Sequence, residues 1–310
     1  MSSNTVAVED YLALRRGLGF KLRSAGLALL DFATFLDHEH APYITNDLAL
    51  RWAMLPQQCQ PALWAARLRY VRGFARHRRA TDPRTEIPPD TLLPFRPQRA
   101  RPYLYSDPEI HRLLAAATAL PPLNGLRGAT YHCLFGLLTV TGLRISEAIA
   151  LEPRDVDLQH GVLTIRGAKF GKSRLVPLHR SSQRVLTRYA CRRDQHLGSK
   201  IPPRFLVNDQ GRSLESSNVR RVFYKLSRQI GLRGPTDTHG PRLHDFRHRF
   251  AVRTLMRWYR SGQDAERCMP VLSTYLGHAH IGDTYWYLST HPQLMGLAKR
   301  RLEKRWEYWP

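Results

Sequence analysis

The sequence predicts a mainly α-helical protein of two domains, with a small antiparallel β-sheet or hairpin in the second domain. Apolar residues recur at helical spacing in the first 80 residues and again in much of the remaining chain. A proline-rich stretch interrupts this pattern between residues 81 and 103. A single segment, 155–179, is rich in β-branched residues. The chain of 310 residues is long enough for two hydrophobic cores.

Residues 1–80 predict a small helical domain. One apolar helix face carries Leu29, Phe32, Ala33 and Leu36, and a second carries Trp64, Leu68, Val71 and Ala75. Several guanidinium groups project from the other side of the second helix or follow it, and such a row suits a phosphate backbone. The arginines that we expect to bind a polyanion there are Arg69, Arg72, Arg76 and Arg79.

Residues 81–103 predict the linker between the domains. Prolines recur along this stretch, and they forbid a continuous helix while favouring extended backbone. The linker also carries arginines, including Arg99 and Arg101. We therefore expect the linker itself to lie along a polyanion.

Residues 104–310 predict a larger, mostly helical domain. Ser106 is a candidate N-cap for its first helix, with Pro108 in the first turn and Glu109 at the capping-box position. Further along, the runs VLTIRG and RLVPLH indicate two strands joined by a turn that contains Gly and Lys. This pattern predicts a β-hairpin within the helical domain.

The charge balance indicates the kind of partner. A formal net charge of +23, from 48 Lys and Arg against 25 Asp and Glu, favours a polyanion, with nucleic acid as the first candidate. Apolar runs such as CLFGLLTV are far shorter than the roughly 20 residues of a membrane-spanning helix, and the N-terminus lacks the pattern of a signal peptide. We therefore expect a cytoplasmic, nucleoid-associated protein with no membrane partner. The four cysteines are isolated, which argues against a disulfide framework or a zinc site.

Four short motifs carry side chains suited to chemistry at a phosphate. They are TGLRISEAIAL with Arg144, the hairpin ending in KSRLVPL with Lys169 and Lys172 on its turn, HDFRHRFA with His244 and Arg247, and LGHAHIGDTYWYL with His278 and Tyr287. Each residue alone is also common on protein surfaces or in cores. In this order, over about residues 104 to 290, they resemble the tyrosine recombinases, the phage integrase family of DNA-breaking and DNA-joining enzymes.

The resemblance implies a two-domain architecture, in which a helical core-binding domain and a mixed α/β catalytic domain clamp duplex DNA. It places the nucleophile nine residues after His278, which selects Tyr287 and leaves Tyr285 out of register. Counting back from RLVPL favours Lys169 as the family's lysine, although the Gly-containing turn leaves the register open. Lys172 is then a candidate DNA contact.

The implied reaction explains the residue types. A tyrosine hydroxyl conserves the energy of the phosphodiester in a covalent 3′-phosphotyrosine, and the forked groups of Arg144 and Arg247 suit the charge on the non-bridging oxygens. Lys169 would protonate the leaving 5′-oxygen. His244 would assist proton transfer with the tyrosine, and His278 would donate to the phosphate. The resemblance implies no metal and no other cofactor.

The resemblance also implies how the protein assembles. Its partner would be double-stranded DNA, on which a homotetramer joins two sites, with room for accessory recombination proteins. The tail can form an apolar helix face from Leu294, Leu297, Ala298 and Leu302. That face would either pack on its own domain or be exchanged between protomers. The most direct role is the integration or excision of a mobile element, and the sequence specifies neither the DNA site nor the element.

Competing interpretations explain fewer residues. The pair His278 and His280 resembles the metal site of relaxases, but no β-rich run precedes it and the arginine motifs would stay unexplained. His244 and His248 have HExxH spacing, but Asp245 replaces the Glu base and an arginine lies between them. The intact catalytic set argues against a non-catalytic DNA-binding factor of the same fold. A type IB topoisomerase, which would use the same covalent chemistry, remains open.

Overall fold

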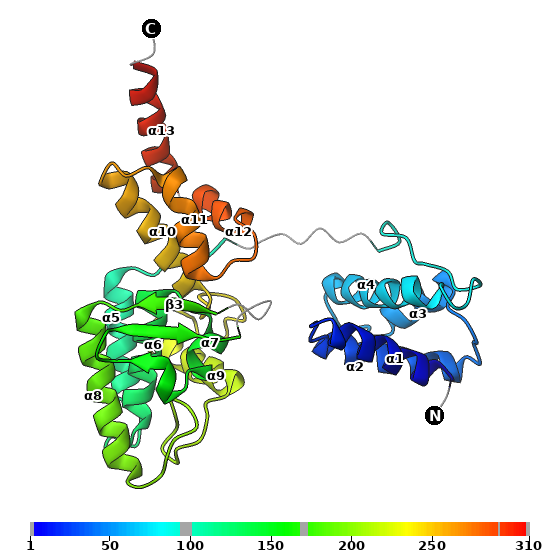
Figure 1. Cartoon of the computed structure of the whole chain (residues 1–310), viewed down its shortest axis with the longest axis horizontal. Helices are drawn as coiled ribbons and strands as arrows, with labels where there is room; N and C mark the ends of the chain where they lie inside the picture. The colour runs from blue at the N-terminus through cyan, green and yellow to red at the C-terminus, as the bar shows by residue number, and fades with distance from the viewer. Residues whose placement is uncertain (1–2, 94–100, 168–172, 291, 308–310) are drawn as a thin grey trace. The chain divides into compact units, whose positions relative to one another are not determined.

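The computed structural model describes residues 3–93, 101–167, 173–290 and 292–307, and the chain divides into two compact units, residues 1–100 and 101–310 (Figure 1). Each unit has its own hydrophobic core. Helices dominate both, and the sheet found among the described residues has three antiparallel strands. The predicted fold class is confirmed.

The first unit is a bundle of short helices. These are α1 (Ser3–Gly17), α2 (Arg23–His38), α3 (Asn46–Met54) and α4 (Pro61–Arg78). The predicted apolar face of α2 is buried, with Phe32 packed against Trp52 of α3 at a ring-centroid distance of 4.9 Å. On α4, Leu68 and Val71 complete the core.

Residues 82–93, part of the predicted linker, pack on the first unit. Arg72 Nε donates to the carbonyl of Pro88 (2.6 Å), and its Nη2 donates to that of Pro89 (2.8 Å). Leu92 and Leu93 pack against the helical core. Prolines end the helix, but their carbonyls still accept hydrogen bonds, so a proline-rich segment can be fixed on a helix surface.

The second unit holds the remaining elements. In chain order they are α5 (Asp107–Thr118), α6 (Arg127–Thr141), α7 (Ile145–Ala150), η1 (Pro153–Asp155), β1 (Val156–Asp157), β2 (Val162–Ile165), β3 (Arg174–Pro177), α8 (Arg180–Leu197), α9 (Ser216–Gln229), α10 (Asp245–Arg260), α11 (Ala265–Leu276), α12 (Gly282–Tyr285), η3 (Trp286–Thr290) and α13 (Pro292–Glu307).

Two predicted details of this unit are confirmed. The capping box is present at the start of α5, where the Ser106 backbone N–H donates to Glu109 Oε2 (2.7 Å) and Glu109 N–H donates to Ser106 Oγ (3.4 Å). The two strand-like runs form the antiparallel pair β2 and β3, with buried Leu163 opposite buried Val176. A short strand that was not predicted, β1, pairs with the other edge of β2.

Helix α6 is the central element of the second unit, and it is buried on nearly every side. It ends at Gly142, whose φ of 63° is left-handed. A Cβ there would lie 2.7 Å from the ring of Phe250 on α10, so glycine is needed both for the backbone and for the close approach. The chain that leaves α6 is thereby directed across the start of α10. Among the described residues, no helix is long and apolar enough to cross a bilayer.

Candidate active site

The structure brings five predicted catalytic residues together, and they come from segments far apart in the sequence. They are Arg144 at the start of α7, His244 and Arg247 at the start of α10, His278 just after α11, and Tyr287 in η3. The rings of His278 and Tyr287 have centroids 6.0 Å apart, and the positive charges of Arg247 and Arg144 act on the Tyr287 phenol. Lys169 and Lys172 lie outside the described residues.

Arg144 occupies the N-cap position of α7. Its backbone N–H donates to Glu147 Oε2 (3.0 Å), and its Nη1 donates to Glu147 Oε1 (2.8 Å). Its Nη2 donates to the carbonyl of Gly277 (3.1 Å). The side chain is half-buried, so the guanidinium is oriented by the protein and yet remains partly open to a ligand.

Arg247 is almost completely buried. Its Nη1 donates to the carbonyl of Gly142 (2.9 Å), and its Nη2 donates to that of Leu276 (2.6 Å). Burial and the nearby charge of Arg144 lower the pKa of Arg247 to about 10, so it remains protonated at neutral pH. A second fixed cation therefore lies beside Tyr287.

Three arginines bind consecutive carbonyls at the end of α11. Arg174 Nε donates to Tyr275 O (2.7 Å), while Arg247 and Arg144 donate to the next two carbonyls. The last carbonyls of a helix lack partners within it and favour cations nearby. Because His278 follows directly, these bonds fix the starting point of the segment that carries both His278 and Tyr287.

Sequence analysis missed the acidic residue that holds this cluster together. Glu147 bonds Arg144 and also accepts from Arg174, with Nη1 to Oε1 at 3.1 Å and Nη2 to Oε2 at 2.8 Å. Burial alone would raise the pKa of Glu147, but hydrogen bonds from Arg174 and the Arg144 backbone lower it below its usual value. The signal was available, since Glu147 lies three residues after Arg144, at the position that completes a capping box.

Tyr287 is beside the arginines but shielded from solvent, with 2 % of its surface exposed. Its ring packs against His248 and Trp286, at centroid distances of 5.4 and 5.7 Å. Burial raises the pKa of Tyr287, and the charge of Arg247 opposes that rise. Tyr285 is 44 % exposed. Solvent exposure therefore favours Tyr285 as the residue that reaches DNA, whereas the sequence register favours Tyr287.

The two predicted catalytic histidines are neutral at neutral pH. Burial and the charge of Arg247 lower the pKa of His278 to about 4. Its Nδ1 lies 2.6 Å from Oγ1 of buried Thr284, a residue that was not singled out in the sequence. The pKa of His244 is also lowered, by desolvation and then by Arg247. A neutral imidazole can both accept and donate a proton.

The predicted DNA contacts differ in their surroundings. Arg69, Arg76 and Arg79 are exposed on or just after α4, and Arg101 is exposed in the second unit. Arg72 departs from the prediction, because its guanidinium binds the proline carbonyls described above and pairs with Asp90 (2.8 Å). Its side chain faces segment 82–93 rather than open solvent. Arg99 lies outside the described residues.

The comparison with known proteins decides the family. Residues 104–293 match the phage integrase family. The chain belongs to the phage integrase family. The Sinorhizobium fredii protein y4rB, which carries the name integrase/recombinase, is 57% identical over 99% of each chain. The tyrosine recombinase XerD of Caulobacter vibrioides is 33% identical over 73% of this chain and 70% of its own.

Solved structures of recombinases share the fold of this phage integrase family member. A Tn1549 transposon integrase, in complex with a circular intermediate DNA, has a TM-score of 0.67 at 16% identity, covering 96% of this chain and 98% of its own. The site-specific recombinase XerH, bound to its difH substrate, has a TM-score of 0.66 at 17% identity, covering 100% and 86%. The predicted two-domain recombinase fold and the predicted activity, site-specific DNA recombination, are confirmed at the level of the family.

Proposed function

We propose that this site cuts and rejoins duplex DNA through a covalent bond between Tyr287 and the 3′ phosphate. The observation that carries the proposal is the position of the Tyr287 phenol, which lies within the influence of the Arg247 and Arg144 charges and beside the ring of His278. A phenol beside two fixed cations matches what attack on a phosphodiester requires, since negative charge develops on the phosphate oxygens.

The two arginines would stabilise the charge at phosphorus. The phosphate's non-bridging oxygens would accept from Arg144 and Arg247, whose orientations are set before DNA binds by the carbonyls of Gly277, Gly142 and Leu276. Donors that need no reorganisation during the reaction contribute most to catalysis. The protein therefore supplies two cations where other phosphoryl-transfer enzymes use metal ions.

The proton transfers follow from the protonation states. As the Tyr287 oxygen bonds to phosphorus, its proton would pass to neutral His244. The bond from phosphorus to the 5′-oxygen breaks, and Lys169 would protonate that oxygen. A Thr284 hydroxyl that donates to Nδ1 of His278 leaves the ring proton on Nε2, which can then donate to the phosphate. Rejoining reverses these steps, with the 5′-hydroxyl of another strand as the attacking group.

Cleavage on this scheme needs a local rearrangement, because Tyr287 is shielded by its own unit. The segment from Gly277 to η3 would shift so that the phenol reaches a bound phosphate. Its neighbour Trp286 and the buried His248 pack against the ring and would separate from it. Tyr287 would thus attack only after DNA or a second protomer displaces these contacts.

The covalent step has a direct test. A nicked DNA substrate that releases the short downstream fragment with the new 5′-hydroxyl on cleavage traps the phosphotyrosine, and the adduct is visible as a slower band on a denaturing gel. We expect the adduct for the wild type and for Tyr285→Phe, and none for Tyr287→Phe. We expect the same yield in EDTA, because the arginines replace a metal. An adduct with Tyr287→Phe, or its loss in EDTA, contradicts the proposal.

The likeness to recombinases bound to DNA supports duplex DNA as the partner, and the tail supports assembly. Met295, Leu302 and Trp306 are exposed apolar side chains on α13, which offer a surface to a second copy. We therefore place a tetramer on two paired sites, acting in the integration or excision of a mobile element on DNA in the cytoplasm. A two-site assay separates this from a topoisomerase, since only a recombinase gives joined products from two marked duplexes.

A further inference from the structure

Arg174, the first residue of β3, makes three hydrogen bonds, two to Glu147 and one to Tyr275. Its side chain is 8% exposed. The two Nη atoms form a fork onto both carboxylate oxygens of Glu147, and Nε donates to Tyr275 O. Bidentate pairs of this kind fix orientation as well as charge. Arg174 thus joins the hairpin to α7 and to the end of α11.

Glu147 and the end of α11, which Arg174 binds, also bind Arg144. Glu147 accepts from the Nη1 and the backbone N–H of Arg144. Tyr275 belongs to the same helix end as Gly277, whose carbonyl accepts from Arg144 Nη2. The guanidinium of Arg144 is therefore oriented between two groups whose own positions depend on Arg174.

Gly277 makes room for this arrangement. A Cβ on Gly277 would lie 2.7 Å from Arg174 Nη1, and the residue has a φ of 68°. A side chain at this position would be strained by the backbone and would also push Arg174 from its carbonyl. The Leu-Gly-His motif thus contributes space for Arg174 as well as a helix end.

We propose that Arg174 is a positioning residue for Arg144, required for the guanidinium to meet the charge on the scissile phosphate. This inference rests on the proposed function. A purely structural role would have a different signature: loss of one partner of a buried ion pair destabilises the fold, but it does not make the defect depend on the charge of the substrate.

The test compares Arg174→Gln with Arg166→Gln in the full chain. Arg166 follows β2 in the same hairpin and pairs with Asp155 (2.5 Å), so its loss controls for breaking an ion pair there. We expect Arg174→Gln to bind DNA like the wild type and to cleave a saturated substrate roughly 10- to 100-fold more slowly, as for other supporting residues. Arg166→Gln should cleave at the wild-type rate.

A substrate with a neutral methylphosphonate at the scissile position gives the deciding readout. It has less charge for Arg144 to neutralise, so the ratio of wild-type to Arg174→Gln rates should fall toward one, as it should for Arg144→Gln. An unchanged ratio, or an Arg174→Gln variant that matches Arg166→Gln, overturns the inference. If Arg174→Gln does not fold, Arg174→Lys allows the same comparison, since it keeps the charge but not the fork. Failure of the wild type to cleave would instead reject the proposed function.

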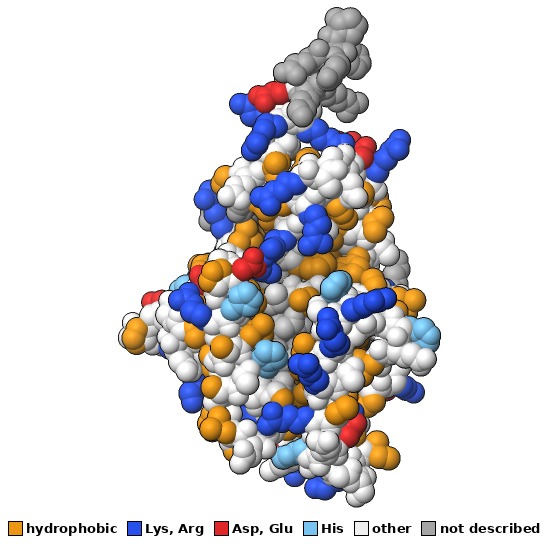
Figure 2. Space-filling model, turned by 90° about the vertical axis from the view of Figure 1, so that its left-hand side faces the viewer, with side chains coloured by type: hydrophobic (Ala, Val, Ile, Leu, Met, Phe, Trp, Pro, Cys, Tyr) orange, Lys and Arg blue, Asp and Glu red, His pale blue; other side chains and the backbone are white. Residues whose placement is uncertain are grey.

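A separate surface of the second unit carries a row of exposed arginines. Arg180, Arg184, Arg188 and Arg192 recur every fourth residue along α8, so they form one face, the arginine stripe. All four are exposed, and the first three have no carboxylate partner among the residues that the structure describes. Figure 2 shows Lys and Arg side chains gathered along this side of the unit.

The acidic side chain near the Arg192 end of the arginine stripe, Asp209, accepts from the backbone N–H groups of Leu126 and Arg127. The neighbouring helix α6 and segment 119–126, whose carbonyls bind Arg192, contain no acidic residue. Like charges four residues apart weaken a helix, so the fold alone gives no reason for the stripe. Successive members are about 6 Å apart along the helix axis, a spacing at which several phosphates of one duplex can be contacted.

We infer that the arginine stripe binds the phosphate backbone of duplex DNA outside the active site. Binding of a long non-specific duplex by the Tyr287→Phe protein would be followed against salt. Replacing Arg180, Arg184 and Arg188 by Gln should reduce the slope of log K against log salt by about 0.9 for each lost phosphate contact. A control triple replaces Arg154, Arg166 and Arg267, which already pair with Glu152, Asp155 and Asp264.

The control should change the slope much less than the stripe variant. Equal changes in both triples would mean that only net charge matters, and no change in the stripe variant would mean that the stripe faces solvent or an acidic protein. Either result overturns the inference. The salt slope of the unsubstituted protein reports DNA binding by itself, so the proposed function is judged separately.

Discussion

The two histidines that contact Tyr287 are kept neutral by their surroundings. Burial is the largest cause for both, and it lowers the pKa of His278 to about 4 and that of His248 to about 3. Arg247 and His244 add to the effect, because another positive charge beside them would be repelled. Neutral rings suit this site, since His278 then donates without competing with the arginines for the phosphate.

These shifts predict that the protein loses stability in mild acid. Between pH 6.5 and about 4, the unfolded chain binds protons at His248 and His278 that the folded chain does not bind, so the free energy of unfolding falls as the pH falls. Urea unfolding at a series of pH values measures this. His248→Phe removes one titrating group while keeping a ring against Tyr287, so its curve should be flatter. Parallel curves for the two proteins would contradict the prediction.

At the scale of the residue, the motifs predicted which side chains meet but not what orients them. The four motifs gave Arg144, Arg247, His278 and Tyr287 because each chemistry demands a particular side chain. Arg174 was within a quoted motif, KSRLVPL, but its partners are 27 and 101 residues away in the chain, and a single sequence does not show such pairs. The sequence did not predict that Arg72 binds the carbonyl of Pro88, because that partner is also distant in the chain.

At the scale of the element, the site is built where helix ends meet. Helix α6 ends at Gly142, α11 ends at Gly277, and α7 and α10 begin at Arg144 and His244. The two helix ends present free carbonyls, and the arginines of the other two bind them. The electrostatics of the backbone therefore orient the guanidinium groups of Arg144 and Arg247 before any DNA is bound.

Local sequence patterns predicted individual helices and strands better than they predicted which of them lie together in the fold. The capping box at Ser106 and the β2–β3 pair could be predicted because their signals lie within a few residues. The convergence of α7 with the end of α11 depends on the packing of the whole second unit. The local signals for this convergence are Gly142 and Gly277. A glycine after an apolar run also ends many ordinary helices, so these signals are not specific.

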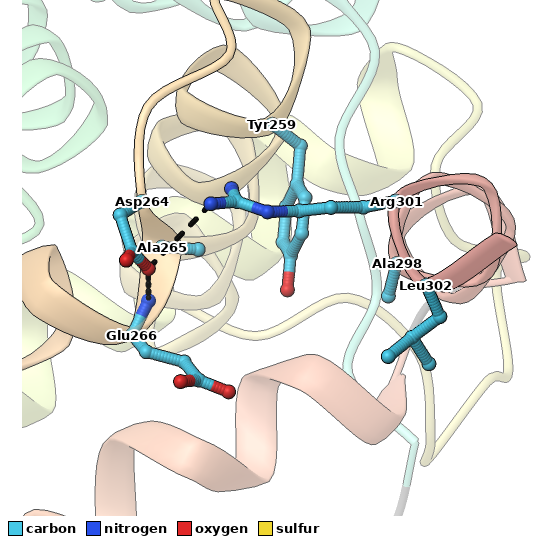
Figure 3. Close-up of a pocket in the computed structure, with 7 residues that line it drawn as sticks. All are labelled: Tyr259, Asp264, Ala265, Glu266, Ala298, Arg301 and Leu302. Atoms are coloured by element: carbon cyan, nitrogen blue, oxygen red, sulfur yellow. Dashed lines mark hydrogen bonds and ion pairs between the residues drawn. The ribbon is translucent and has the colours of Figure 1, made fainter. Parts of the chain in front are cut away.

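At the scale of the whole molecule, α13 connects the cluster around Tyr287 to an exposed apolar surface. In the structure, α13 packs on its own unit, with Leu294 fully buried in the cluster that contains Tyr287. Arg301 reaches from α13 to Asp264, the N-cap of α11, beside a pocket of about 250 Å³ (Figure 3). Leu302 lines this pocket but remains half-exposed. One helix thus has a buried residue in the cluster that contains Tyr287 and an apolar surface that is exposed.

This division predicts separable effects of changes in α13. Leu294→Ala leaves a cavity beside Tyr287, so it should cost about 2 to 5 kcal/mol of stability and disturb cleavage of a single site. Replacing Leu302 and Trp306 by Ser removes only exposed apolar surface, so single-site cleavage should persist while the joining of two sites is lost. Gel shifts that resolve one-site from two-site complexes, with adduct trapping on each, measure both effects.

Deleting residues 292–310 should abolish two-site complexes and disturb cleavage, because it removes both the buried Leu294 and the exposed apolar surface of α13. A truncated chain that recombines two sites at the full rate would show that α13 is not needed for assembly.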